Sequence, residues 1–186
     1  MRLNGRVFEA AVAGWERRTR RDLYHSALVV RLPEGDYAVE MGPEQRGDGA
    51  ARGAVAGGPV GSRLLRRWRI FRYEVRRERD GVIPDVAEAV DSPRRLTGDE
   101  LIARHLFDLV ARVPTPVWGR DELGTGEMWN SNSLTSWVIA RSGLPVEHLH
   151  PPAGGRAPGW DAGLAMAARA AGPPDPLSPP AAPAAP

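Results

Sequence analysis

Residues 25–41 read HSALVVRLPEGDYAVEM, and this stretch decides the fold class. Its two halves, 25–31 and 37–41, are rich in β-branched and aromatic side chains, so each predicts a strand. Between them, Pro33 presets a turn-compatible φ and Gly35 permits a positive one, which is the chemistry of a hairpin. The stretch therefore predicts two antiparallel strands joined by a tight turn.

Further strands are expected on both sides of this hairpin. Residues 6–12 predict one, with apolar side chains at Val7, Ala10 and Val12. In residues 68–79, apolar residues alternate with charged ones, a period of two that predicts a strand with one buried and one wet face. The alternating residues are Phe71, Tyr73 and Val75 against Arg72, Glu74 and Arg76. Residues 42–61 are rich in Gly and Ala, and we expect a mobile loop there.

Two main helices follow. The sequence Thr97-Gly-Asp-Glu100 has the spacing of a capping box, with Thr97 as the N-cap of a helix over residues 97–112. A second helix is predicted over residues 130–142, where Gly143 is a suitable residue for the position after its end. Asp161 is expected to cap a short, Ala-rich helix that reaches residue 171.

These elements predict an α+β fold: an antiparallel sheet of four to five strands, packed by the helices over 97–112 and 130–142. With 186 residues, the chain is long enough for one domain with a real core, which we assign to residues 1–172. Residues 173–186 are mostly Pro and Ala and are expected to be a disordered tail, because they cannot bury enough apolar surface.

Composition excludes several functions. There is no cysteine, which rules out disulfides, thiolate metal sites and a cysteine nucleophile. All 25 basic residues are arginine, as a GC-rich bacterial genome would produce, and the net charge of +2 makes nucleic-acid binding an unlikely role. No apolar run approaches the ~20 residues of a membrane span, and no signal-like stretch opens the chain, so a cytoplasmic location is expected.

No cofactor and no metal site are predicted. His148 and His150 form a pair without a third ligand nearby, which makes a poor zinc site. The Gly-rich stretch 57–61 lacks the lysine and the hydroxyl residue of a phosphate-binding loop.

Three polar residues could together carry out acyl chemistry. His25 begins one strand of the hairpin and Glu40 ends the other, so their side chains could face one another. Ser131 would lie in the first turn of a helix, where free N–H groups and the helix dipole stabilise an anion. A serine hydroxyl needs a base, and the base needs an orienting acceptor; Ser131, His25 and Glu40 could fill these roles. Polar and aromatic residues in the flanking segments could line a substrate pocket, namely Trp129, Asn130, Asn132, Arg120 and Asp121.

This pattern resembles the permuted papain-like fold of the NlpC/P60 superfamily, in particular its lecithin retinol acyltransferase-like branch. His25 matches the base at a strand start, and Glu40 matches the second polar position on the next strand. Ser131, in Asn130-Ser-Asn-Ser-Leu134, matches the position of the nucleophilic cysteine at a helix start. The resemblance implies a papain-like hydrolase or acyltransferase with serine in place of cysteine, acting on a small-molecule, acylated or peptide-like substrate.

Two other hypotheses remain open. Serine depends wholly on its base, so the chain could be an inactive relative that binds a ligand without turnover. Alternatively, the arginines of residues 63–79 could bind an anionic partner. Each candidate residue also has a purely structural interpretation: Ser131 as an ordinary first-turn serine, His25 as a strand-edge histidine and Glu40 as a surface carboxylate.

Overall fold

The computed structural model describes residues 22–45, 47, 49, 52–83, 86–90 and 93–170, and it confirms the α+β prediction. Four antiparallel strands form one sheet in the order β1-β2-β4-β3. The strands are β1 (Leu28–Leu32), β2 (Gly35–Pro43), β3 (Ala54–Pro59) and β4 (Arg72–Arg79). The helices are α2 (Glu100–Val110), α3 (Ser131–Arg141) and α4 (Trp160–Ala170), with short 3-10 turns η2 (Arg63–Arg67), η3 (Arg69–Phe71) and η4 (Val86–Glu88). No helix in these described ranges is both long and apolar enough to cross a bilayer.

The predicted hairpin is present. Strands β1 and β2 pair from Leu28 opposite Val39 to Leu32 opposite Gly35, with Pro33 and Glu34 in the turn. The first strand begins at Leu28, three residues later than predicted, so His25 lies in the segment that leads into it. The predicted strand at 6–12 and the predicted tail at 173–186 lie outside the described residues.

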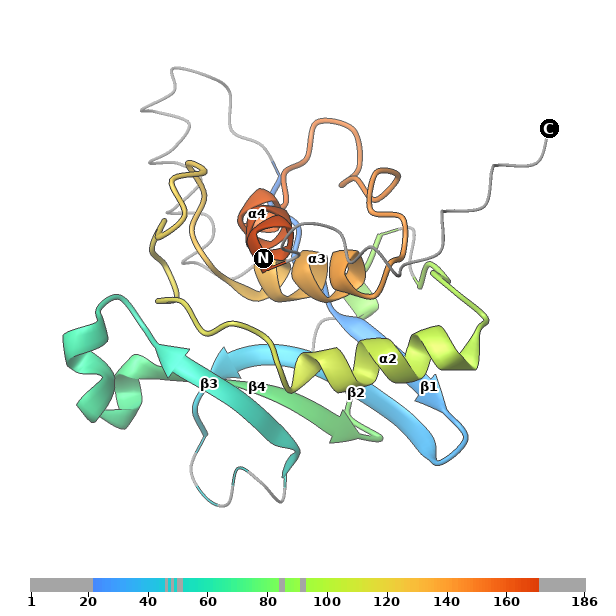
Figure 1. The fold of residues 1–186 in the computed structure, drawn as a ribbon, viewed down its shortest axis with the longest axis horizontal. Coiled ribbons are helices and arrows are strands. Elements are labelled where there is room, and N and C mark those ends of the chain that lie inside the picture. The colour runs from blue at the N-terminus through green and yellow to red at the C-terminus, as the bar shows by residue number, and fades with distance from the viewer. Residues whose placement is uncertain are drawn as a thin grey trace.

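All three helices lie on one side of the sheet, as Figure 1 shows. Helices α2 and α3 pack over it, and α4 covers the outer side of α3. The sheet contributes alternate residues to this core, including Val30, Leu32, Val39, Met41 and Val75. Helix α3 is enclosed from all sides, with buried residues at every position from Asn132 to Ile139. The helix that carries the candidate nucleophile is therefore the central element of the fold.

The predicted loop at 42–61 is wrong in its second half, where β3 pairs with β4. Gly57 and Gly58 allow the two strands to approach closely, because they have no side chain. A Cβ at Gly57 would lie 2.6 Å from the carbonyl oxygen of Tyr73. A Cβ at Gly58 would lie 2.7 Å from the Tyr73 ring. The strand forms through its backbone, with few large side chains of its own.

The alternation of apolar and charged residues predicted that the polar face of β4 is exposed to solvent, but this face is buried at Glu74 and Arg76. Glu74 and Arg76 are only 5% and 7% exposed, and the Arg76 guanidinium lies 3.3 Å from the carboxylates of both Glu74 and Glu40. Arg52 lies 3.6 Å from Glu74. The sheet thus buries an ion-pair network on the face away from the helices.

The first main helix begins at Glu100, and its N-cap is Asp99 rather than Thr97. The Asp99 carboxylate accepts hydrogen bonds from the N–H groups of Leu101 and Ile102, whereas the Thr97 hydroxyl accepts only from the N–H of Asp99. The second main helix matches its prediction, with Asn130 as its N-cap and Gly143 at φ +76° just beyond its end. Asp161 lies inside the first turn of α4 and does not cap it.

This correction gives a stability prediction. We expect Asp99→Ala to lower the free energy of unfolding by about 1 kcal/mol, because two helix N–H groups lose their acceptor. Thr97→Ala removes one hydrogen bond outside the helix and is expected to cost about 0.5 kcal/mol. Urea denaturation of both variants measures the difference, and equal costs would contradict the assignment of the cap.

Candidate functional site

The start of α3 has a complete set of capping interactions. The Asn130 side chain accepts hydrogen bonds from the N–H groups of Asn132 and Ser133, at 2.8 and 3.4 Å. In return, the Ser133 hydroxyl accepts from the N–H of Asn130 at 3.1 Å. This capping box fixes the first turn, and the N–H of Ser131 has no acceptor among the described residues.

Ser131 and His25 meet at this helix start. The Ser131 Oγ lies 2.8 Å from the His25 Nδ1, although the two residues are 106 positions apart in the chain. His25 is exposed and Ser131 is half-buried, so the pair is open to solvent. The predicted convergence of the two side chains is present, and the distance is that of a direct hydrogen bond.

Asn132 holds the segment that carries His25. Its Oδ1 accepts hydrogen bonds from both the N–H and the hydroxyl of Ser26, each at 2.8 Å. Its Nδ2 donates to the carbonyl of Tyr24 at 3.0 Å. A single buried amide thus holds the residues on either side of His25 and orients that segment relative to Ser131, the residue that precedes Asn132. Asn132 therefore positions the His25 segment, and its predicted place in a substrate pocket stays a prediction.

The segment before α4 completes this arrangement. Backbone hydrogen bonds join Tyr24 N–H to the Arg156 carbonyl and Arg156 N–H to the Asp22 carbonyl, each at 2.8 Å. The carbonyl of Pro158 accepts from the side-chain amides of both Asn130 and Asn132. Residues 156–158 therefore contact both chain segments that supply the Ser–His pair.

Glu127 anchors the same segment and was not recognised from the sequence. Its carboxylate accepts from the N–H groups of Gly159 and Asp161 at 2.8 and 3.1 Å, and it lies 3.4 Å from the Arg156 guanidinium. A carboxylate at the start of α4 is favourable because of the free N–H groups and the helix dipole. A single Glu in a Gly-rich loop gives no local signal for such a contact, because its partners lie 29 to 34 residues further along.

Glu40 is not brought to His25. Its carboxylate lies 3.3 Å from Arg76, on the sheet face away from the helices. Successive residues of a strand point to opposite faces, and the flanking Val39 and Met41 point into the core beneath α3. Glu40 therefore points away from the side on which His25 meets Ser131, and the predicted role as the group that orients His25 has no structural support.

The remaining pocket candidates have structural contacts. Trp129 is 2% exposed and belongs to the core. It closes the base of the 119–129 loop, through hydrogen bonds of its backbone to Gly119 and Arg120. The Arg120 guanidinium donates to the carbonyl of Gly61.

Asp121 organises that loop from within. Its carboxylate accepts hydrogen bonds from the N–H groups of Leu123, Thr125 and Gly126. Desolvation raises the pKa of Asp121, but the hydrogen bonds from these N–H groups outweigh it, so the pKa lies below its ordinary value. These hydrogen bonds of Arg120 and Asp121 lie within the loop or reach Gly61, and the predicted role of both residues in substrate binding stays a prediction.

In the described part of the chain, no three His, Asp or Glu side chains are grouped so as to hold a metal ion. A hollow of about 220 Å³ is lined by residues of β3, β4 and η2, including Tyr73, Arg66 and Arg72, and not by Ser131 or His25. Its charged lining residues are of both signs, and we assign it no role.

Comparison with known proteins gives no identification: the chain matches no protein family, no curated protein and no solved structure. The class of site is therefore defined by its own geometry, as a serine hydroxyl at a helix start hydrogen-bonded to a histidine.

Proposed function

We propose that this protein is a serine-dependent hydrolase or acyltransferase that acts on an ester, thioester or amide. The observation that carries the proposal is the 2.8 Å contact between Ser131 Oγ and His25 Nδ1 at the start of α3. A neutral hydroxyl becomes nucleophilic when a base within hydrogen-bond distance removes its proton, and histidine does this near neutral pH. The proposal also rests on the resemblance to the permuted papain-like fold, in which His25 and Ser131 match the base and the nucleophile.

The reaction follows from the roles of the two groups. Ser131 Oγ attacks the carbonyl carbon while its proton passes to Nδ1 of His25, which requires the tautomer protonated on Nε2. The tetrahedral intermediate then collapses, and His25 returns the proton to the leaving alcohol, thiol or amine. Water or an amine attacks the resulting acyl-serine in a second step, with His25 again acting as base.

The helix start supplies the electrostatic support. Because Asn130 takes up the N–H groups of Asn132 and Ser133, the N–H of Ser131 itself is the donor left for an oxyanion. The positive end of the helix dipole lies at the same place and favours the negative charge of the intermediate.

A ligand-binding domain without turnover is the second candidate. The observation that favours it is the position of Glu40, whose carboxylate is engaged with Arg76 on the other face of the sheet. Glu40 is thus not the carboxylate that would orient His25 and balance the imidazolium formed in the reaction, a role on which the rate of such a pair depends strongly.

Labelling with a fluorophosphonate probe tests the proposal. We expect the probe to modify Ser131, as located by mass spectrometry, and His25→Ala to abolish the modification while the fold is retained. His105→Ala changes an exposed histidine on α2 and is the matched control, with labelling unchanged. Glu40→Gln is also expected to leave labelling unchanged, because its carboxylate does not face His25.

A second measurement covers the case in which the pocket rejects the probe. In Ser131→Cys, the helix start and His25 are expected to lower the pKa of the thiol, so that iodoacetamide reacts with it faster than with the same thiol in a His25→Ala background. Equal rates in the two backgrounds, with no labelling of the natural chain, would overturn the enzyme hypothesis and favour ligand binding.

A further inference from the structure

The connection between β3 and β4 carries large apolar side chains into solvent. Leu64 is 84% exposed, Ile70 is 79% exposed and Trp68 is 45% exposed. These residues belong to η2 and η3, and we call residues 63–71 the 63–71 projection. In Figure 1 it extends beyond the β3–β4 end of the sheet, at the left of the view, away from the β1–β2 hairpin. Single exposed apolar residues are common, but three within seven positions call for an explanation.

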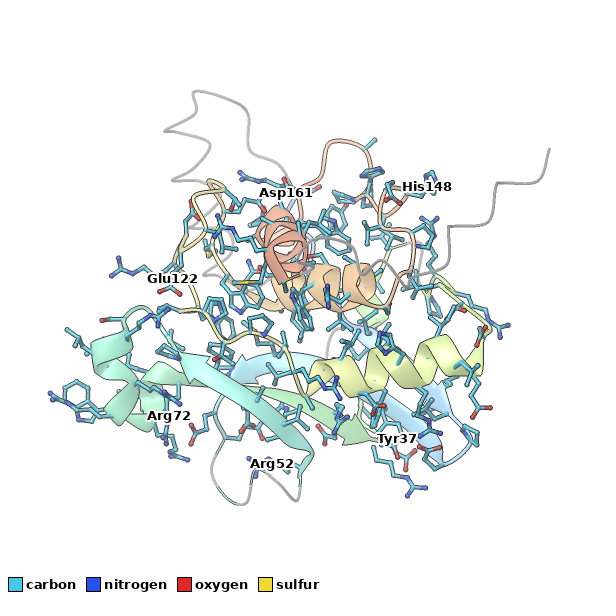
Figure 2. All side chains as sticks on the ribbon, viewed as in Figure 1. Tyr37, Arg52, Arg72, Glu122, His148 and Asp161 are labelled. Carbon is cyan, nitrogen blue, oxygen red and sulfur yellow. The ribbon has the colours of Figure 1, made fainter. Side chains whose placement is uncertain are left out.

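The same segment carries positive charge that no acidic side chain of the described residues neutralises. Arg63, at the start of the segment, pairs with Glu122, and Arg72, just after its end, pairs with Glu44. Glu122 and Arg72 are labelled in Figure 2. Arg66, Arg67 and Arg69 have no carboxylate partner among the described residues, and Arg67 instead stacks 3.9 Å over the Trp68 ring. No acidic residue occurs between Asp48 and Glu74 in the sequence.

Hydrogen bonds to the rest of the protein hold the projection in place. The Ser62 hydroxyl caps η2 by accepting from the N–H of Leu64, and the N–H of Gly61 donates to the Trp118 carbonyl. The Arg63 guanidinium makes two 3.0 Å hydrogen bonds to Glu122. The exposed side chains of the projection, among them Leu64, Ile70, Arg66 and Arg67, are therefore held by an ordered backbone, which lowers the entropy lost when a partner binds.

We infer that the 63–71 projection docks onto a membrane surface containing anionic phospholipid. Leucine and isoleucine side chains enter the boundary between headgroups and acyl chains, and tryptophan is favoured at the same level. The guanidinium groups of Arg66, Arg67 and Arg69 then meet the lipid phosphates, where each basic residue adds to the attraction. This combination of exposed aliphatic residues with unneutralised arginines matches the two chemical layers of a bilayer surface.

A nucleic acid is the competing partner, and the aliphatic residues argue against it. Single-stranded nucleic acid binds through arginines and through aromatic rings on which bases stack. Trp68 and the arginines would serve that purpose, but Leu64 and Ile70, the two most exposed members of the group, would contribute nothing. This inference is independent of the proposed enzyme activity, because it uses no residue of the Ser–His site.

Vesicle co-sedimentation of the full chain tests the inference. We expect binding to vesicles of phosphatidylcholine with phosphatidylserine, weak binding to phosphatidylcholine alone, and a blue shift of tryptophan emission on binding. The triple variant Arg66→Gln, Arg67→Gln, Arg69→Gln is expected to lose about 100-fold in affinity, at about 1 kcal/mol per arginine near an anionic surface. A control triple outside the projection, Arg31→Gln, Arg94→Gln, Arg95→Gln, makes the same change in net charge and is expected to retain most of the binding.

Substitution of the aliphatic residues distinguishes a membrane partner from a nucleic acid. Leu64→Ser with Ile70→Ser is expected to weaken binding to anionic vesicles at least tenfold, whereas Leu101→Ser, at an 80% exposed leucine of α2, leaves it unchanged. Ser131→Ala is expected to bind vesicles as the natural chain does. Failure to bind anionic vesicles would overturn the inference. So would vesicle binding that survives Leu64→Ser with Ile70→Ser, or tighter binding of a single-stranded oligonucleotide that depends on the three arginines.

Discussion

Arg76→Ala is expected to lower the free energy of unfolding by about 3–5 kcal/mol, the cost of removing one partner from a buried ion pair. Arg76 is 7% exposed and lies between the carboxylates of Glu40 and Glu74, each 3.3 Å away. Without it, the partner of Glu74 among the described residues is the more distant Arg52 at 3.6 Å, and Glu74 is itself 5% exposed. The large cost comes from a carboxylate left in a place that water hardly reaches.

Urea denaturation measures this cost, and an exposed pair provides the control. Arg31 and Asp36 pair at 3.1 Å with side chains 79% and 51% exposed, so Arg31→Ala is expected to cost less than about 1 kcal/mol. Combining Arg76→Met with Glu74→Leu removes both charges and is expected to recover part of the loss. A cost for Arg76→Ala as small as that of the control would show that solvent enters this face of the sheet.

Gly163→Ala is expected to destabilise the protein by about 2 kcal/mol, through overpacking between α3 and α4. A Cβ at this position would lie 2.0 Å from the Ser136 hydroxyl and 2.2 Å from the carbonyl oxygen of Ser133. The second contact is with backbone, so it cannot be relieved by a side-chain rotation. The sign of this stability change is informative, because a Gly→Ala substitution inside a helix ordinarily stabilises a protein by about 1 kcal/mol.

The matched control is Ala168→Gly, at an exposed position of the same helix. It is expected to cost about 1 kcal/mol, so that alanine is preferred at 168 and glycine at 163. Stabilisation by Gly163→Ala would mean that α4 can move away from α3 at little cost. Thermal denaturation of both variants, followed by circular dichroism, gives the comparison.

Local patterns in the sequence predicted the elements that are determined locally. The hairpin followed from its turn residues and β-rich runs, and α3 followed from Asn130 and Gly143 at its two ends. Strand β3 was missed because strand prediction relies on side chains. Gly57 and Gly58 have none, and their role is to let the backbone of β3 approach Tyr73.

The candidate site was half predicted. The meeting of Ser131 with His25 was expected from the resemblance and from the chemistry of a helix start. The assignment of Glu40 failed although the signal was present, since apolar Val39 and Met41 flank it and must face the core. The burial of Glu74 and Arg76 had no such signal, because it depends on partners far away in the chain, such as Arg52 and Glu40.

The contacts of Pro158 and Arg156 have a consequence for the order of events during synthesis. His25 leaves the ribosome more than a hundred residues before Ser131, and the segment that secures both of them follows later still. Long-range contacts of this kind form only after the intervening chain is available to close the loop. The hairpin can form early. A growing chain that stops short of residue 158 lacks the contacts that hold the segments of His25 and Ser131 together. A nascent chain therefore lacks the complete Ser–His geometry until the segment that leads into α4 has been synthesised.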